Sequence, residues 1–258
     1  MILFRSQLNL FYIALAFLTR VPVPLSVDYS QDKLNQASRY FPLVGWLVGF
    51  LSGFTFWIFN FILPNEISLL ISMLLGLFIT GCFHEDGLAD TCDGFGGGWD
   101  KQQKLSIMKD SRLGTYGAAG IWFVLTIKFF LLLNLAEVSN SFAIIAMLVA
   151  HPLSRAVSTS MIFILPYVTD EETSKVKPLA ESHQTIDLQI SLAIGLLALL
   201  LVSSVALWLV VVLSIYLVLM RYLLLKQIQG FTGDTLGATQ QVAEILIYTV
   251  LLAGGASI

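Results

Sequence analysis

Apolar runs long enough to cross a lipid bilayer restrict this chain more than any other feature. A transmembrane helix needs about 20 such residues. Six runs approach or exceed this length: 41–63, 67–83, 117–135, 141–165, 188–220 and 242–258. The run 188–220 is about 50 Å long as one helix, so we read it as two helices folded back near Trp208. The sequence predicts an all-α, polytopic membrane bundle of about seven transmembrane helices, forming a single domain over residues 1–258.

The placement of basic residues predicts the orientation of this bundle. With seven spans, four polar stretches fall on one face: 1–40, 84–116, 166–187 and 221–241. Of the 14 Lys and Arg residues, Lys128 and Arg155 lie inside predicted spans, and the other twelve lie on this face. The asymmetry is the positive-inside pattern, which predicts that these stretches face the cytoplasm.

The N-terminal stretch 1–40 differs from the spans. Its apolar part, 8–18, has only 11 residues and is followed by no small-residue cleavage site. This pattern predicts an interfacial or re-entrant helix rather than a signal peptide. A net charge of −3 offers no electrostatic support for nucleic-acid binding. Cys82 and Cys92 form no CxxC pair, and a zinc site made with His84 is a weak alternative.

Closely spaced carboxylates open the stretch 84–116, which we interpret as a catalytic loop. They are Glu85, Asp86, Asp90 and Asp93. On a helix continuing from the second span, Asp86, Asp90 and Asp93 share one stripe, where they repel one another unless a cation lies between them. Mg²⁺ is commonly held by a few carboxylates together with substrate phosphates. The spacing therefore predicts a metal site, with Glu85 as a flanking ligand or a supporting group. A solvated helix end is the alternative.

Glycines and basic residues follow these carboxylates. The sequence "GFGGG" at 94–98 predicts a helix break that leaves the backbone N–H groups of Gly96, Gly97 and Gly98 free to face an anion. In "IMKDSRLGTYG", Lys109 and Arg112 flank Asp110. Arg and Lys both bind phosphate oxygens, although a membrane-edge anchor is an equal interpretation for Lys109. Metal, basic groups and glycine backbone together are typical of phosphoryl transfer.

Two later residues are further candidates for the same site. Arg155, in "HPLSRA", lies deep in a predicted span, where a cation faces either a wet cavity or an acidic partner. Asp234, in "GFTGDTLGA", is predicted to lie in a flexible loop formed with Gly230, Gly233 and Gly237 before the last span. Asp234 either completes the site or caps the last helix, and spacing alone leaves both readings open.

Six motifs in order resemble the cobalamin synthase family, whose members are adenosylcobinamide-GDP ribazoletransferases. These motifs are "FLTRVPVP" at 17–24, "RYFPLVGWLVG" at 39–49, "HEDGLADTCDGFGGG" at 84–98, "IMKDSRLGTYG" at 107–117, "HPLSRA" at 151–156 and "GFTGDTLGA" at 230–238. They extend over nearly the whole chain, and "EDGLADTCDG" is the most specific of them.

The resemblance implies a reaction that joins adenosylcobinamide-GDP to α-ribazole or its 5′-phosphate with release of GMP. It also implies Mg²⁺ dependence and a location in the cytoplasmic (inner) membrane. Association with other cobalamin-assembly enzymes and a homo-oligomer are compatible with it. On this reading Glu85, Asp86, Asp90 and Asp93 form the metal and catalytic site. The expected substrate- and phosphate-binding residues are Gly96, Gly97, Gly98, Lys109, Asp110, Arg112, Arg155 and Asp234.

Two other functions compete with this reading. "DGLAD" partly resembles the start of the CDP-alcohol phosphotransferase motif, although Asp90 stands where that family has Arg. Such an enzyme would act on a lipid acceptor and would need a lateral opening between spans. A cation-coupled transporter would place its ionisable groups near the midplane and expose sites on both faces. The short turns predicted on the opposite face disfavour transport.

Overall fold

A computed structural model describes residues 2–168 and 184–255. Their regular structure is helical, apart from an isolated bridge between Tyr167 and Phe231. The helices are α1 (Ile2–Leu18), α2 (Gln31–Ala37), η1 (Ser38–Tyr40), α3 (Phe41–Phe59), α4 (Asn65–Thr80), α5 (Phe83–Gly97), α6 (Lys101–Met108), α7 (Thr115–Val138), α8 (Asn140–Ile164), α9 (Thr185–Leu196), η2 (Leu197–Val202), α10 (Ala206–Ile228) and α11 (Gly233–Gly255). Most of the predicted polar stretch 166–187 lies outside the described residues.

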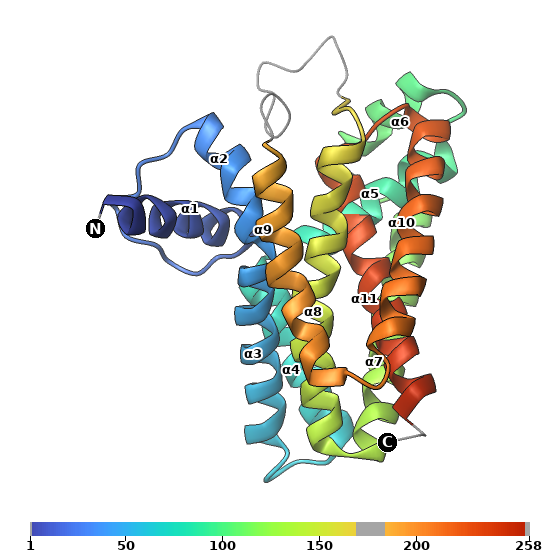
Figure 1. The fold of residues 1–258 in the computed structure, drawn as a ribbon. Helices are drawn as coiled ribbons and strands as arrows, with labels where there is room; N and C mark the ends of the chain where they lie inside the picture. The colour runs from blue at the N-terminus through green and yellow to red at the C-terminus, as the bar shows by residue number, and fades with distance from the viewer. Residues whose placement is uncertain (1, 169–183, 256–258) are drawn as a thin grey trace.

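The helices confirm the predicted polytopic membrane bundle. Six of them are long and apolar enough to cross a bilayer, counting α3 with the preceding α2 and η1, and α9 with η2. The short α4 is joined to α5 at an 85° bend, which raises the number of spans to seven if this pair counts as one. We treat α4 as the span and α5 as a helix lying outside it. Figure 1 shows the long helices side by side in one bundle.

Two predicted boundaries were wrong. The long run 188–220 does form two helices, but they meet at residues 203–205 rather than at Trp208, which lies in α10. The last span begins at Gly233 rather than at Val242, so Gly233, Asp234 and Gly237 belong to α11 and not to a flexible loop. Glycine and threonine lower helix propensity there, and packing against neighbouring helices overrides that preference.

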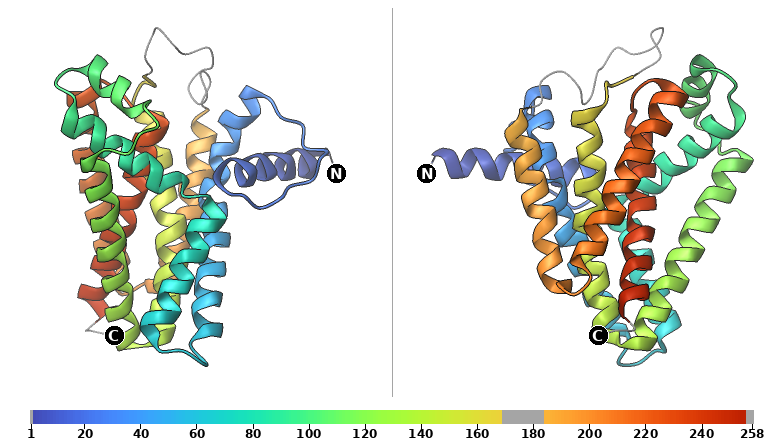
Figure 2. Two further views of the ribbon diagram at one scale, coloured as in Figure 1. Left: turned by 180° about the vertical axis from the view of Figure 1, so that it is seen from behind. Right: turned by 45° about the vertical axis from the view of Figure 1, so that its right-hand side comes forward.

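Elements rich in polar residues gather at one end of the bundle, which we call the polar end. Figures 1 and 2 show α2, α5 and α6 at this end, with α1 lying across the bundle rather than along it. At the opposite end, short turns join α3 to α4, α7 to α8 and η2 to α10. None of these turns contains Lys or Arg. The placement of α1 at a membrane surface stays a prediction.

Helix α8 lies at the centre of the bundle, packed against α3, α7, α9 and α11. The glycines that recur every four residues in α3 explain its close approach to α3. A Cβ atom on Gly45 would lie 2.5 Å from the His151 carbonyl oxygen, and one on Gly49 would lie 2.7 Å from that of Met147. This small-residue row therefore serves packing, as membrane helix pairs commonly require. Helix α8 continues through Pro152 without a break.

Candidate active site

The sharp turn between α4 and α5 directs the acidic stretch away from the membrane spans. Gly81 and Cys82 both adopt left-handed backbone conformations, with φ of 63° and 59°. Glycine adopts this conformation without steric cost, and it ends α4 as a typical C-cap. Helix α5 then carries Asp86 and Asp90 to the polar end, Asp86 exposed and Asp90 half-buried.

Two glycines bring the start of α11 against α5. A Cβ atom on Gly87 would lie 2.8 Å from the backbone oxygen of Asp234, and one on Gly237 would lie 2.9 Å from that of His84. Two helix backbones can come this close only where the residues at the contact lack a Cβ atom. The crossing places Asp234 beside the α5 carboxylates, although almost 150 residues separate them in sequence.

The carboxylates of Asp86, Asp90 and Asp234 form an acidic cluster at this crossing. Burial, together with the negative charges of Asp234, Asp86 and Asp93, raises the pKa of Asp90 to about 7. Neighbouring carboxylates disfavour one another's ionisation because their negative charges repel, and a bound cation would relieve this repulsion. The structure contradicts the capping reading of Asp234, and its role in a metal or substrate site stays a prediction. The side chain that caps α11 is Thr232, whose hydroxyl accepts a hydrogen bond from Thr235 N at 3.2 Å.

Asp93 is held by backbone hydrogen bonds from another helix. Its two carboxylate oxygens accept hydrogen bonds from the backbone N–H groups of Gly114 and Gly117, at 2.7 and 2.8 Å. These N–H groups belong to the start of α7, where helical donors lack partners within the helix. Asp93 is buried there and holds the loop after α6 against α5.

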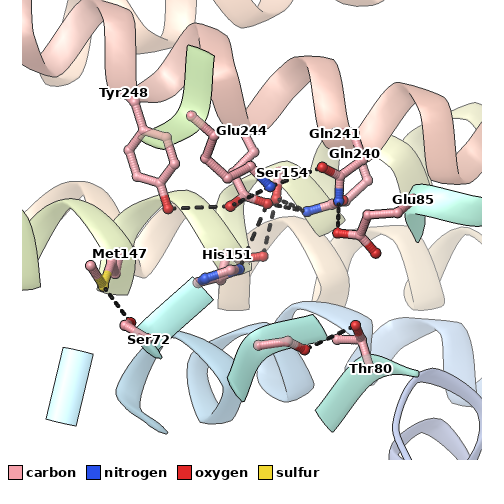
Figure 3. Close-up of polar contacts among 12 residues, drawn as sticks. Ser72, Thr80, Glu85, Met147, His151, Ser154, Gln240, Gln241, Glu244 and Tyr248 are labelled. Atoms are coloured by element: carbon pink, nitrogen blue, oxygen red, sulfur yellow. Dashed lines mark hydrogen bonds and ion pairs between the residues drawn. The ribbon is translucent and has the colours of Figure 1, made fainter. Parts of the chain in front are cut away.

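Glu85 points into the bundle rather than toward the acidic cluster. Its Oε1 accepts a hydrogen bond from Gln241 at 2.7 Å (Figure 3). The Gln241 side-chain oxygen in turn accepts one from Lys128 at 2.8 Å. Its other oxygen, Oε2, is buried and has no hydrogen-bond partner in the structure. Because α5 turns successive residues about 100° apart, Glu85 and Asp86 face different surroundings.

A buried polar network extends from Glu85 across α7, α8 and α11. Glu244 is its hub. It pairs with Lys128 at 3.2 Å and lies 3.7 Å from His151, and it accepts hydrogen bonds from Gln240 and Tyr248. Gln240 also donates to Ser154, as Figure 3 shows. Buried charges require such partners, since an isolated charge in an apolar interior is strongly disfavoured.

These side chains line a polar cavity with an empty volume of about 500 Å³, open solvent at its mouth included. Its lining includes Glu85, Lys128, His151, Arg155, Gln241 and Glu244. Arg155 is only 2% exposed and donates to the His151 carbonyl at 2.9 Å. In the described part of the chain, Arg155 forms no ion pair with a carboxylate, which was one reading of this residue. Its Nε has no hydrogen-bond partner there.

The glycines after Asp93 end the helix as predicted, but only at the last of them, because Gly94, Gly96 and Gly97 are helical and Gly98 is an extended C-cap. Helix α5 continues through Gly97, and Gly98 N donates to the Gly94 carbonyl at 3.0 Å. Gly96 instead admits the Tyr116 ring, which a Cβ atom would meet at 2.5 Å. The anion-binding role of Gly96, Gly97 and Gly98 remains a prediction.

The basic residues of the predicted loop lie at the exposed surface of the polar end. Arg112 is 87% exposed and pairs with Asp110, Nε to both carboxylate oxygens at 3.0 Å. The Arg112 hydrogen bonds lower the pKa of Asp110. Lys109 is also exposed. In the described part of the chain, the Asp110–Arg112 pair forms no hydrogen bond or ion pair with the acidic cluster.

The acidic cluster fits Mg²⁺ by its donor chemistry. Within the ranges 2–168 and 184–255, no three His, Cys, Asp or Glu side chains already converge as a formed metal site. Three carboxylates at an open end nevertheless offer the oxygen ligands that Mg²⁺ prefers, and this ion usually retains waters and substrate phosphates as its remaining ligands. Asp86, Asp90 and Asp234 are the residues that would hold it.

Sequence reasoning missed the buried network. Gln240, Gln241 and Glu244 were assigned no role, and Lys128 was left without one. A lysine in the middle of an apolar run was the available signal, because such a residue needs a buried acidic partner. Glu244, the only acidic residue in the run 242–258, was the candidate for that partner.

Comparisons with known proteins agree on one family. The family model for cobalamin-5-phosphate synthase matches residues 10–252. A Shewanella frigidimarina protein named adenosylcobinamide-GDP ribazoletransferase is 52% identical over 97% of both chains. Proteins of the same name from Shewanella oneidensis and Shewanella pealeana are 51% and 48% identical, over 97% and 98% of this chain and 96% and 98% of their own. No solved structure matches.

Proposed function

The chain belongs to the cobalamin-5-phosphate synthase family, and on that basis we propose that it joins adenosylcobinamide-GDP to α-ribazole, or to its 5′-phosphate. A ribose hydroxyl oxygen attacks the phosphorus bound to the corrinoid side chain. A new P–O bond forms, the bond to the bridging oxygen breaks, and GMP leaves. The hydroxyl proton passes to a base. The enzyme is a transferase of cobalamin biosynthesis with several membrane-spanning helices.

The observation that carries the proposal is the crossing of α5 and α11 at Gly87 and Gly237, which assembles Asp86, Asp90 and Asp234. We assign these three residues to Mg²⁺, whose charge, when bound, neutralises a diphosphate and stabilises a leaving phosphate. Asp93 is left out of this set because both its oxygens already accept backbone hydrogen bonds.

Glu85 is assigned as the base for the ribose hydroxyl rather than as a metal ligand. It is adjacent to Asp86 in sequence but faces the polar cavity, and its unpartnered Oε2 can accept a proton. A general base must lie within hydrogen-bond reach of the proton that it removes. Gln241 and Lys128 fix the orientation of this carboxylate.

We assign donor binding to the basic residues near the polar end. Lys109 and Arg112 lie on its exposed surface, where a large corrinoid has access, and Arg offers a planar fork for phosphate oxygens. The excess of Lys and Arg at this end supports a cytoplasmic orientation in the inner membrane. Both substrates are then taken from the cytoplasm.

The test is turnover by purified protein in nanodiscs. Supplied with adenosylcobinamide-GDP, α-ribazole and Mg²⁺, the protein is expected to release GMP, and chelation of the metal is expected to stop the release. An Asp90→Asn variant that folds normally is expected to be inactive. Well-folded protein that releases no GMP would overturn the proposal.

One observation favours the alternative function, transfer to a lipid acceptor, and a second version of this assay tests it. An apolar groove lined by Leu70, Leu74, Leu125 and Phe129 opens sideways between α4 and α7. It shares Met73, Leu77 and Leu125 with the polar cavity. A CDP-alcohol and a lipid acceptor are therefore offered to the same preparation. Transfer to the lipid, in place of GMP release, would support the alternative.

A further inference from the structure

Five of the six sequence motifs meet at one cavity that the assignments above leave unused. It has an empty volume of about 410 Å³, open mouth included, and we call it the aromatic cavity. Its lining includes Phe17, Phe41, Phe83, Arg155, Thr159 and Leu236. These residues come from α1, α3, α5, α8 and α11, so separate parts of the chain converge there.

Aromatic rings form one wall of this cavity. Phe17 and Phe41 stack nearly parallel with ring centroids 5.7 Å apart, and Phe83 meets Phe17 edge-on at 5.4 Å. Leu18 and Ile162 add apolar surface. Cavities with apolar and aromatic walls and a few polar groups are typical of small-molecule sites. Flat aromatic ligands gain additional stabilisation by packing against such rings.

Two polar atoms in this wall lack partners. Arg155 and Thr159 are 2% and 1% exposed, and neither Arg155 Nε nor Thr159 Oγ1 has a hydrogen-bond partner in the structure. Buried polar groups are nearly always satisfied, because leaving one unpaired is costly. Both atoms can donate a hydrogen bond. No carboxylate is among the lining residues, so the cavity suits a ligand that accepts hydrogen bonds.

The aromatic cavity adjoins the acidic cluster. Gly233, Leu236 and Gly237 in the first turns of α11 belong to its lining, and Asp234 lies among them in the same turn. His84 and Arg155 line both this cavity and the polar cavity that holds Glu85. A ligand in the aromatic cavity therefore reaches from apolar walls toward both the acidic cluster and the proposed base.

We propose that the aromatic cavity is the acceptor subsite, which takes the benzimidazole base of α-ribazole and leaves its ribose beside the acidic cluster. This assignment rests on the proposed function. The base is flat, uncharged and apolar, and in the nucleoside its ring offers one acceptor nitrogen and no N–H. A 5′-phosphate remains outside the apolar walls, so both forms of the acceptor fit.

The guanine of the donor is the competing occupant, and hydrogen-bond chemistry disfavours it. Guanine carries a ring N–H and an amino group that need acceptors. Among the lining side chains only His84 and the hydroxyls of Ser158 and Thr159 can accept, whereas Arg155 can only donate. Buried donors without acceptors would oppose binding.

Removal of one hydroxyl tests the assignment without removing an internal hydrogen bond. Thr159→Val keeps the side-chain shape, and because Thr159 Oγ1 has no partner, we expect normal folding. The dissociation constant of α-ribazole, measured by calorimetry in nanodiscs without metal or donor, is expected to rise about fivefold, the factor of one neutral hydrogen bond. The matched control is Thr55→Val on α3, whose hydroxyl bonds only to the Leu51 carbonyl. It is expected to bind α-ribazole as the wild type does.

A second variant fills the cavity, and guanosine serves as the comparison ligand. Ser158→Leu is expected to raise the KM for α-ribazole at least tenfold and to leave the KM for adenosylcobinamide-GDP unchanged. Unchanged α-ribazole affinity in both variants, or guanosine binding that Thr159→Val weakens, would overturn the assignment. If wild-type protein binds α-ribazole but releases no GMP, the proposed function fails while this subsite stands.

Discussion

The carboxylate of Asp93 accepts a hydrogen bond from the backbone N–H of Gly117, with 2.8 Å between oxygen and nitrogen. This contact ties the acidic helix α5 to the start of α7. It also explains both glycines of the "GTYG" sequence, because a Cβ atom on Gly114 or Gly117 would overlap the Asp93 carboxylate. The third carboxylate of the predicted metal stripe therefore has a positioning role in this structure.

Substitution of Asp93 is expected to affect stability more than metal affinity. Asp93→Asn keeps one acceptor oxygen and turns an amide group toward a backbone N–H, so we expect a loss of about 2 kcal/mol of unfolding free energy. The Mg²⁺ concentration for half-maximal GMP release is expected to stay near the wild-type value, whereas Asp86→Asn raises it strongly. Thermal unfolding and metal titration of the two variants check this. A raised Mg²⁺ requirement in Asp93→Asn at unchanged stability would restore Asp93 as a ligand.

The contact between α5 and α11 predicts a glycine effect on activity. Gly87→Ala places a methyl group 2.8 Å from the Asp234 backbone oxygen and pushes α11 away from Asp90. A displacement of about 1 Å at a catalytic site costs about a hundredfold in rate. We expect that fall in kcat, measured by GMP release. Gly76→Ala is the control, because its methyl group would lie 3.5 Å from the nearest atom, Ser52 Oγ, an ordinary contact. Equal rates in the two variants would contradict the prediction.

The membrane spans could be predicted from the sequence, but the direction in which individual site side chains point could not. The apolar runs and the uneven distribution of Lys and Arg between the two faces depend on local composition alone. The bundle of about seven helices could therefore be predicted. Glu85 and Asp93 are directed by partners more than 20 residues away, Gln241 and the Gly114–Gly117 backbone. Gly94 and Gly96 stay helical because Met108 and Tyr116 pack on them, a tertiary effect that overrides helix propensity.

Asp110 and Arg112 form an ion pair at the surface. Substitution of one or the other is expected to have opposite effects on the binding of adenosylcobinamide-GDP. Arg112→Ala removes a phosphate ligand, so the KM for adenosylcobinamide-GDP is expected to rise several-fold. Asp110→Asn removes the competing carboxylate and is expected to lower that KM. Both side chains are at the surface, where ion pairs contribute little to folding. The melting temperature is therefore expected to stay constant, and steady-state kinetics check the two KM values. A change in melting temperature without a change in KM would assign the pair a structural role.

The buried ion pair of Lys128 and Glu244 predicts non-additive effects on stability. Their side chains are 8% and 2% exposed, and 3.2 Å separates Nζ from Oε1. Removal of one partner leaves an uncompensated charge in the membrane interior, which costs about 3–5 kcal/mol. We therefore expect a large fall in melting temperature for Lys128→Met and for Glu244→Gln. The double variant is expected to melt above both single variants, because neither charge is left alone. Double-mutant analysis in detergent measures this coupling, and additive losses would show that the two residues act through separate contacts.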